Sequence, residues 1–262
     1  MVMTFVSLLA LLFWFSISPS TALAQTPQAV RTVLEGVYTE AQATRGLSAF
    51  QANCSSCHLN DLSGRNGPPL KGPRFTETWR EFELDALFNA IKENMPPRRS
   101  RAESDARLPD AAYLDILTYI LQGNSFPAGN SELTLAMLED TLLVGMDGPK
   151  PVPNGALVYV VGCLVRTSEE ASEETWMLAN ATEPVRTRTP EETDPAELGN
   201  SEIKPLGTHI FRLQNFDYIA PKFDPAPYAS HRVQAKGYLI RQPNRERINV
   251  TSFETVVSAC KP

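Results

Sequence analysis

Residues 54–58 read Cys-Ser-Ser-Cys-His, and the interpretation of the rest of the chain depends on this pentapeptide. Two cysteines separated by two residues, with a histidine directly after them, are the attachment signature of a c-type haem. Each thiol can add to one vinyl group of the porphyrin, and the adjacent imidazole can ligate the iron. The alternatives are a zinc half-site, a redox dithiol or chance. Zinc would need a second ligand pair nearby, and the other cysteines, Cys163 and Cys260, are distant. A redox dithiol usually follows a strand of a βαβ unit, which the flanking sequence does not predict.

The first 24 residues predict a secretory signal peptide. They contain the apolar run VSLLALLFWFSIS, then Pro19 and the small-residue site Ala22-Leu23-Ala24, so we expect cleavage before Gln25. No Lys or Arg precedes the apolar run, which departs from the usual pattern. An uncleaved anchor is the alternative, but the apolar core is shorter than the ~20 residues that a bilayer span requires. No later segment is long and apolar enough to span, so we expect a periplasmic or secreted protein.

The composition is that of an ordinary globular protein, with 42% hydrophobic residues and a net charge of −6. This charge gives no reason to expect a nucleic-acid partner. With 21 prolines, many of them clustered, the chain should contain substantial connecting segments. Once Cys54 and Cys57 are assigned to haem, the remaining cysteines of an exported protein are expected to form a disulfide.

Three helical patterns surround the pentapeptide. The first covers residues 39–53, with Thr39 as its cap, and the others cover residues 81–93 and 110–122. Gly46 lies within the first, where glycine costs ~1 kcal/mol relative to alanine. A close crossing of two helices would explain this glycine.

A methionine is the expected sixth ligand of the iron, because a thioether raises the reduction potential of a histidine-bound haem. Met95 follows the helical pattern at residues 81–93 and precedes Pro96-Pro97, so it is the preferred candidate. His209 and His231 are the rivals, but they lie in a region of different composition.

The segment Gly67-Pro-Pro-Leu-Lys-Gly72 follows His58 after a short interval. A metal-bound imidazole usually donates its free N–H to a carbonyl group, which fixes the ring plane. A rigid proline turn can present such a carbonyl, and we select that of Pro68. An ordinary loop turn is the alternative.

Taken in order, these motifs resemble a class I cytochrome c domain, most closely the type that accompanies quinoprotein dehydrogenases. The resemblance covers residues 30–127 and rests on the helix with Gly46 and Phe50, CSSCH, GPPLKG, Met95-Pro96 and the last helix with Tyr119. It implies one covalent haem c, with Cys54 and Cys57 as thioether sites, His58 and Met95 as axial ligands, Pro68 as the partner of the imidazole, and Gly46, Phe50 and Tyr119 at the helix crossing. The family's ring of lysines around the haem edge is not evident, and Arg98, Arg99 and Arg101 follow Met95 instead.

The rest of the chain predicts a connection at residues 128–154 and a β domain at residues 155–262. Five β-rich runs follow one another, at residues 156–165, 175–179, 208–213, 231–240 and 247–257. Gly162 and Gly237 lie inside long runs, where a bend would let a strand curl into a small closed barrel. Ala235–Ile240 followed by Ile248–Phe253 resembles the last two strands of OB-fold domains. The expected fold class is therefore multidomain α + β, an all-α cytochrome c domain followed by a five-stranded OB-like barrel.

Two features of the second domain follow from this architecture. Cys163 lies in the first strand and Cys260 just beyond the fifth, and these strands are neighbours when such a barrel closes, so a disulfide between them is expected to contribute ~2–4 kcal/mol. The acidic, proline-containing stretch at residues 183–200 predicts a mobile surface insertion. Although OB-folds often bind nucleic acid, this region has more acids than bases, and binding a strand requires a positive groove.

These observations predict an exported electron-transfer protein rather than an enzyme. A six-coordinate His58/Met95 haem would pass electrons to or from a redox partner such as a periplasmic dehydrogenase or another cytochrome. The alternative is a haem-based sensor or ligand-binding module in which a small gas displaces Met95.

Overall fold

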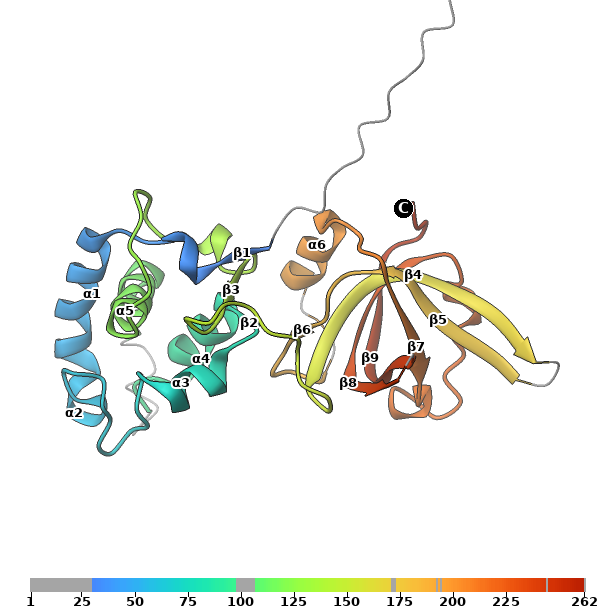
Figure 1. The fold of residues 1–262 in the computed structure, drawn as a ribbon, viewed down its shortest axis with the longest axis horizontal. Helices are drawn as coiled ribbons and strands as arrows, with labels where there is room; N and C mark the ends of the chain where they lie inside the picture. Colours follow the sequence, from blue (N-terminus) through green and yellow to red (C-terminus); the bar gives the residue numbers. More distant parts are fainter. Residues whose placement is uncertain are drawn as a thin grey trace, which may run out of the picture.

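The structure, a computed structural model, describes residues 30–97, 107–170, 173–191, 193, 195–243 and 245–261. They form a helical lobe and a β lobe, with α6 and β6 between them (Figure 1). The predicted signal peptide and Arg98, Arg99 and Arg101 lie outside the described residues. No helix within the described ranges has the length and apolar character needed to cross a bilayer.

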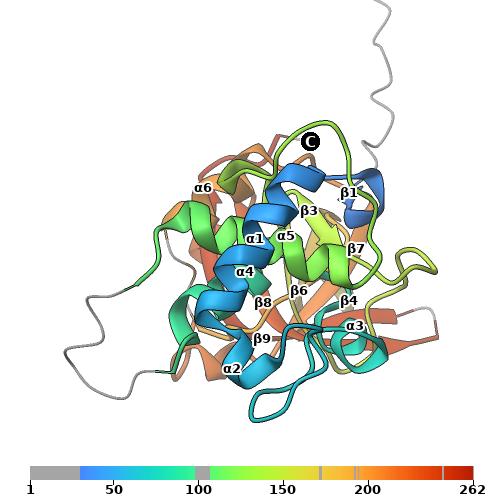
Figure 2. The same cartoon turned by 90° about the vertical axis from the view of Figure 1, so that its left-hand side faces the viewer.

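The described part of the helical lobe contains five α-helices: α1 (Glu40–Asn53), α2 (Ser55–His58), α3 (Pro73–Trp79), α4 (Leu84–Asn94) and α5 (Asp110–Gly123). Thr39 caps α1 as predicted, because its side chain accepts a hydrogen bond from the backbone N–H of Gln42. The helices α1 and α5 pack against each other, and Figure 2 shows both in front of the β lobe.

The predicted helix over residues 81–93 starts later than expected. The structure places Phe82–Glu83 in the short strand β2, and α4 begins at Leu84. The apolar side chain of Phe82 extends the helical stripe in the sequence, but its backbone pairs with β3 (Thr141–Leu143), opposite Leu143. The apolar side chains therefore have the spacing of a helix, but the backbone hydrogen bonds place the start of α4 at a later residue.

Part of the predicted connection packs into the helical lobe. Leu133, Leu138, Leu143 and Val144 are buried in the same core as the helices. The strand β3 also pairs in parallel with β1 (Arg31–Thr32), so the segment after α5 lies beside the first strand of the described residues.

The strands of the described residues form one mixed sheet of nine, in the order β1-β3-β2-β6-β4-β5-β7-β9-β8. Those of the β lobe are β4 (Leu157–Glu170), β5 (Glu173–Ala181), β6 (Val185–Arg186), β7 (His209–Gln214), β8 (Arg232–Gln242) and β9 (Arg245–Val257). Because β4 also pairs with β8, the strands β4, β5, β7, β9 and β8 close into a ring around their own apolar core. The sheet is therefore larger than the predicted set of five strands.

The two lobes are joined through this sheet. Phe82 of β2 pairs with Arg186 of β6, and β6 pairs with β4 on its other side. The guanidinium of Arg186 also lies 4.2 Å from the centre of the Phe82 ring. The helical lobe and the ring of strands thus share backbone hydrogen bonds.

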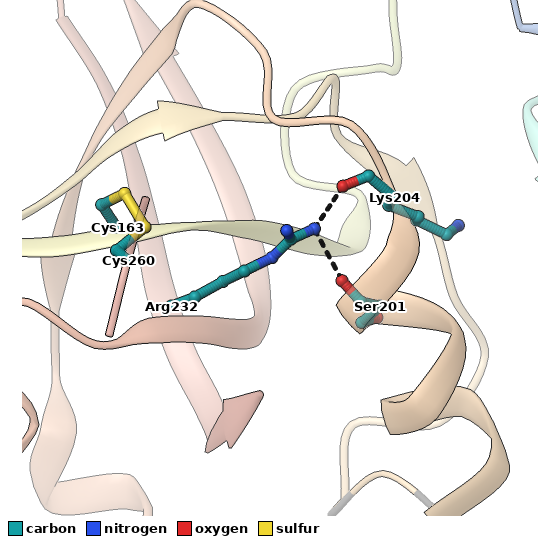
Figure 3. Close-up of a disulfide and its surroundings, with 5 residues drawn as sticks. All are labelled: Cys163, Ser201, Lys204, Arg232 and Cys260. Carbon is teal, nitrogen blue, oxygen red and sulfur yellow. Dashed lines mark hydrogen bonds between the residues drawn. A yellow bond between two sulfur atoms is a disulfide. The ribbon is translucent and has the colours of Figure 1, made fainter. Parts of the chain in front are cut away.

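A helix forms where the sequence predicted a mobile insertion. The helix α6 (Pro195–Ile203) packs on the outer face of the ring. Arg232 of β8 donates hydrogen bonds to the carbonyls of Ser201 and Lys204 at the end of this helix (Figure 3). These partners lie far away in the sequence, so local composition did not reveal them.

Cys163 and Cys260 lie at disulfide distance, with their Cα atoms 5.5 Å apart (Figure 3). The reason given for this pair was wrong, however, because the first strand β4 and the fifth strand β9 are not neighbours. β4 pairs with β5 and β8, and β9 lies between β7 and β8. Cys260 instead reaches β4 beyond the end of β9, where its N–H donates to the carbonyl of Ser230.

Candidate functional site

The imidazole of His58 is held in a fixed orientation. The single turn α2 follows α1 directly, and the backbone N–H groups of Cys57 and His58 both donate to the carbonyl of Cys54. His58 is buried, and its Nδ1 lies 2.8 Å from the carbonyl oxygen of Pro68. Since a carbonyl can only accept, Nδ1 donates this hydrogen bond and Nε2 is the ring nitrogen left for a ligand. A histidine that ligates a metal through Nε2 has this arrangement.

Gly67 lies flat against the His58 ring. A Cβ atom at this position would be 2.5 Å from Cε1 and 2.8 Å from either ring nitrogen, so only glycine fits. The N–H of Gly67 donates to the carbonyl of Cys57, which ties this loop to the pentapeptide. The sequence predicted the contact of Pro68 but not that of Gly67, although the glycine directly before Pro68 was a usable signal.

Asn124 is a second residue that the sequence did not reveal. From the end of α5, its side chain donates to the carbonyl of Leu70 over 2.9 Å and accepts from the N–H of Gly72 over 3.0 Å. These two hydrogen bonds fix the loop that carries Pro68. No sequence pattern predicts such a role for a single asparagine that follows a helix.

The two cysteine thiols are free and half-buried. Burial raises the pKa of the Cys54 thiol to about 11, and Cys57 contributes in the same direction. A redox dithiol needs the opposite shift, because the thiolate is the nucleophile. Among the described residues, no group of three or more His, Cys, Asp or Glu side chains is placed to hold a metal ion.

Met95 lies at the C-terminal end of α4. Its N–H donates to the carbonyl of Ile91, and its own carbonyl accepts a hydrogen bond from the hydroxyl of Tyr113. Its side chain is half-buried and packs against the same core as Cys54. The structure thus places Met95 in the same lobe as the pentapeptide, on a different helix.

The rival histidines both lie in the β lobe and have other partners. His209 of β7 has its Nε2 2.6 Å from Glu183. His231, just before β8, has its Nδ1 3.4 Å from the hydroxyl of Thr255.

The predicted helix crossing is present beside the site. The rings of Phe50 and Tyr119 are 5.2 Å apart, and Gly46 lies against the backbone of Asp115. The hydroxyl of Tyr119 donates to the carbonyl of Asn60, two residues after His58. The crossing is therefore connected to the loop that follows the pentapeptide.

The residues present fit a covalently attached haem c. Two free cysteines precede a histidine whose Nε2 has no hydrogen-bond partner in the described part of the chain. A close-fitting glycine and a carbonyl acceptor orient that imidazole. This donor set is the one that thioether attachment and histidine ligation require.

One protein-family model matches the chain, described as cytochrome C oxidase, cbb3-type, subunit III, over residues 41–120. The match runs from α1 into α5 and includes the pentapeptide, Pro68 and Met95, so it supports a cytochrome c domain in this part of the chain. No curated protein and no solved structure matched the chain.

Proposed function

We propose that this protein is an exported electron carrier with a single haem c, bound covalently through Cys54 and Cys57 and ligated by His58 and Met95. The observation that carries the proposal is the contact between His58 Nδ1 and the Pro68 carbonyl, which leaves Nε2 as the ligating atom. The cytochrome c match over the same residues agrees with it.

When bound, the haem supplies an iron that gains and loses one electron. The residues of the chain keep the surroundings of this iron unchanged. Pro68 and Gly67 prevent the His58 ring from rotating, and the proton on Nδ1 stays in its hydrogen bond. The thioether of Met95, on the end of α4, would close the sixth position and leave no site for a substrate, so we propose no enzymatic reaction.

The proposal also assigns a role to the β lobe. We interpret the ring of β4, β5, β7, β9 and β8 as an OB-like barrel that holds the helical lobe and offers a docking surface. The partner is a redox protein, such as a periplasmic dehydrogenase or another cytochrome. Because the matched family model is named for an oxidase subunit, a terminal oxidase is a further candidate partner.

Optical spectroscopy of the holoprotein tests the axial ligands. The oxidised protein should show the weak sulfur-to-iron band at the red end of the spectrum, and Met95→Ala should abolish it while the haem stays attached. Met146→Ala is the matched control, because the Met146 side chain is exposed at the surface. Retention of the band in Met95→Ala, or its loss in Met146→Ala, would refute the assignment of Met95.

A second candidate is a haem-based sensor in which a small gas displaces Met95. It is favoured by the position of Met95, which is half-buried and is followed directly by the exposed Pro96 and Pro97. Carbon monoxide added to the reduced protein distinguishes the two functions. An electron carrier should bind none at neutral pH, and a sensor should bind it rapidly and stoichiometrically.

A further inference from the structure

A buried polar contact joins the start of α4 to the β lobe. Both carboxylate oxygens of Glu83 lie 2.7 Å from the hydroxyl of Tyr159. The ammonium of Lys204 lies 2.6 Å from Glu83 Oε1 and also contacts the Tyr159 hydroxyl. The side chains of Lys204 and Glu83 are only 17% and 12% exposed, so the pair is largely removed from water.

The three residues come from three separate parts of the fold. Glu83 is the residue that precedes α4, Tyr159 lies on the outer face of β4, and Lys204 directly follows α6. The contact therefore connects the helical lobe to the ring of strands and to α6 at one point.

Lys204 is itself fixed to the β lobe. Its carbonyl accepts a hydrogen bond from Arg232, which also holds the carbonyl of Ser201 (Figure 3). Arg232 pairs in register with Cys163, whose sulfur lies at disulfide distance from Cys260. The ammonium group thus extends toward Glu83 from an anchored segment.

The other end of α4 carries Met95. The helix runs without interruption from Leu84 to Asn94, and Met95 is its C-terminal capping residue. Leu84, Leu87, Phe88 and Ile91 are buried along its length. Because an α-helix is a stiff, internally hydrogen-bonded rod, a displacement at its first turn also moves its last residue.

We propose that Glu83, Tyr159 and Lys204 are positioning residues for Met95: they fix the start of α4 to the β lobe and thereby keep the thioether at its other end in place. This inference rests on the proposed function, since it assigns a role to the β lobe in the ligation by Met95. It also explains why a two-residue strand, β2, carries a buried carboxylate.

The chemistry of the contact supports a positional role. Burial raises the pKa of Glu83, and Lys204 and Tyr159 act in the opposite direction. Removing the ammonium group would leave a buried carboxylate without its charged partner, which is strongly unfavourable. The start of α4 would then have to move toward water or take up a proton.

The test compares two largely buried lysines, Lys204 and Lys236, in the holoprotein. Lys204→Met removes the partner of Glu83. Lys236→Met is the matched control, because Lys236 is buried on β8 beside Tyr159 but bonds to Glu197 and Thr189, and not to α4. The readouts are the sulfur-to-iron band of the oxidised protein and carbon monoxide binding to the reduced protein.

We expect Lys204→Met to weaken the band and to bind carbon monoxide, while Lys236→Met keeps the wild-type band and binds none. Lys204→Arg should restore the wild-type behaviour, because it restores the positive charge. Tyr159→Phe removes only a hydroxyl group and serves as the second variant if Lys204→Met does not fold, with the same changes expected to a smaller extent.

Equal effects of Lys204→Met and Lys236→Met would overturn the inference, because they would indicate general destabilisation of the lobe contact. A wild-type spectrum in Lys204→Met and Tyr159→Phe would overturn it as well. A wild-type protein without the sulfur-to-iron band would instead refute the proposed function, so the two failures are distinguishable.

Discussion

A Cβ atom on Gly46 would lie 1.8 Å from the carbonyl oxygen of Asp115, so α1 and α5 cross with their backbones in contact. The same hypothetical atom would lie 3.0 Å from the Tyr119 side chain. This crossing brings Phe50 beside Tyr119, whose hydroxyl holds the loop after His58. The close approach of two helices thus determines the position of the candidate haem site.

Gly46→Ala is expected to destabilise the protein although alanine is the better helix former. The added methyl group would push α5 away from α1, and overpacking of this kind costs roughly 1–3 kcal/mol. The free energy of unfolding from denaturant titration measures the effect.

Gly199→Ala provides the control for this substitution. Gly199 lies in α6, and apart from its chain neighbours and the backbone of its own helix, no atom lies within 4 Å of the position of its Cβ. Alanine should therefore stabilise this helix by roughly 0.5–1 kcal/mol. If both substitutions shift the stability in the same direction, packing at the crossing is not the reason for Gly46.

Gly67→Ala should disturb the ligation by His58. Its Cβ would lie 2.5 Å from Cε1 of the ring, so the imidazole would have to turn away from the Pro68 carbonyl. We expect an altered haem spectrum, while mass spectrometry still shows the haem attached. Pro68→Ala is the control, because it keeps the carbonyl group that accepts the hydrogen bond and should change the spectrum less. Identical spectra of wild type and Gly67→Ala would contradict this account.

The sequence was informative where one local pattern determined the structure. The apolar stripe and the Thr39 cap predicted α1, and the glycine in that stripe predicted the crossing with α5. The proline turn predicted the contact between His58 and Pro68. Each of these inferences needed only residues close together in the chain, or one residue type with a specific requirement.

The sequence was uninformative where distant segments determined the structure. The strands β2 and β6 have two residues each, which is too short to show a period, and they form because they pair with each other and with β3 and β4. The helix α6 looked like a mobile insertion because Arg232, which holds its end, lies beyond β7. The neighbours of β9 could not be read from strand order, because β9 lies between β7 and β8.

Replacing both Cys163 and Cys260 by serine should lower the free energy of unfolding. The two residues are 97 positions apart, so the bond restricts a long segment of the unfolded chain. The expected loss is ~2–4 kcal/mol in denaturant titration. Reductant should lower the stability of the wild type by a similar amount and leave the serine variant unchanged. Haem attachment should be the same in both proteins, and a wild type that is insensitive to reductant would show that the disulfide does not form.

Asp85→Asn should remove a pH dependence of stability. Burial raises the pKa of Asp85 from 3.8 to about 7, with Glu83, Glu139 and Glu197 acting in the same direction and the N–H of Ala86 opposing it. Between these two values the folded protein retains a proton that the unfolded chain releases. The contribution of Asp85 to stability is therefore complete below pH ~4 and is lost as the pH rises to about 7.

The asparagine variant carries no such charge, so it should equal the wild type at pH ~4 and exceed it at pH ~8 by on the order of 4 kcal/mol. Asp61→Asn should show the opposite trend. Hydrogen bonds from Ser63, and then from Lys71, lower the pKa of Asp61 to about 2, so the stabilisation by Asp61 is present at neutral pH and lost in acid. Denaturant titrations at several pH values measure both variants. Parallel pH profiles of wild type and Asp85→Asn would show that Asp85 does not titrate in this range, and that the carboxylates around the start of α4 are arranged differently from the structure.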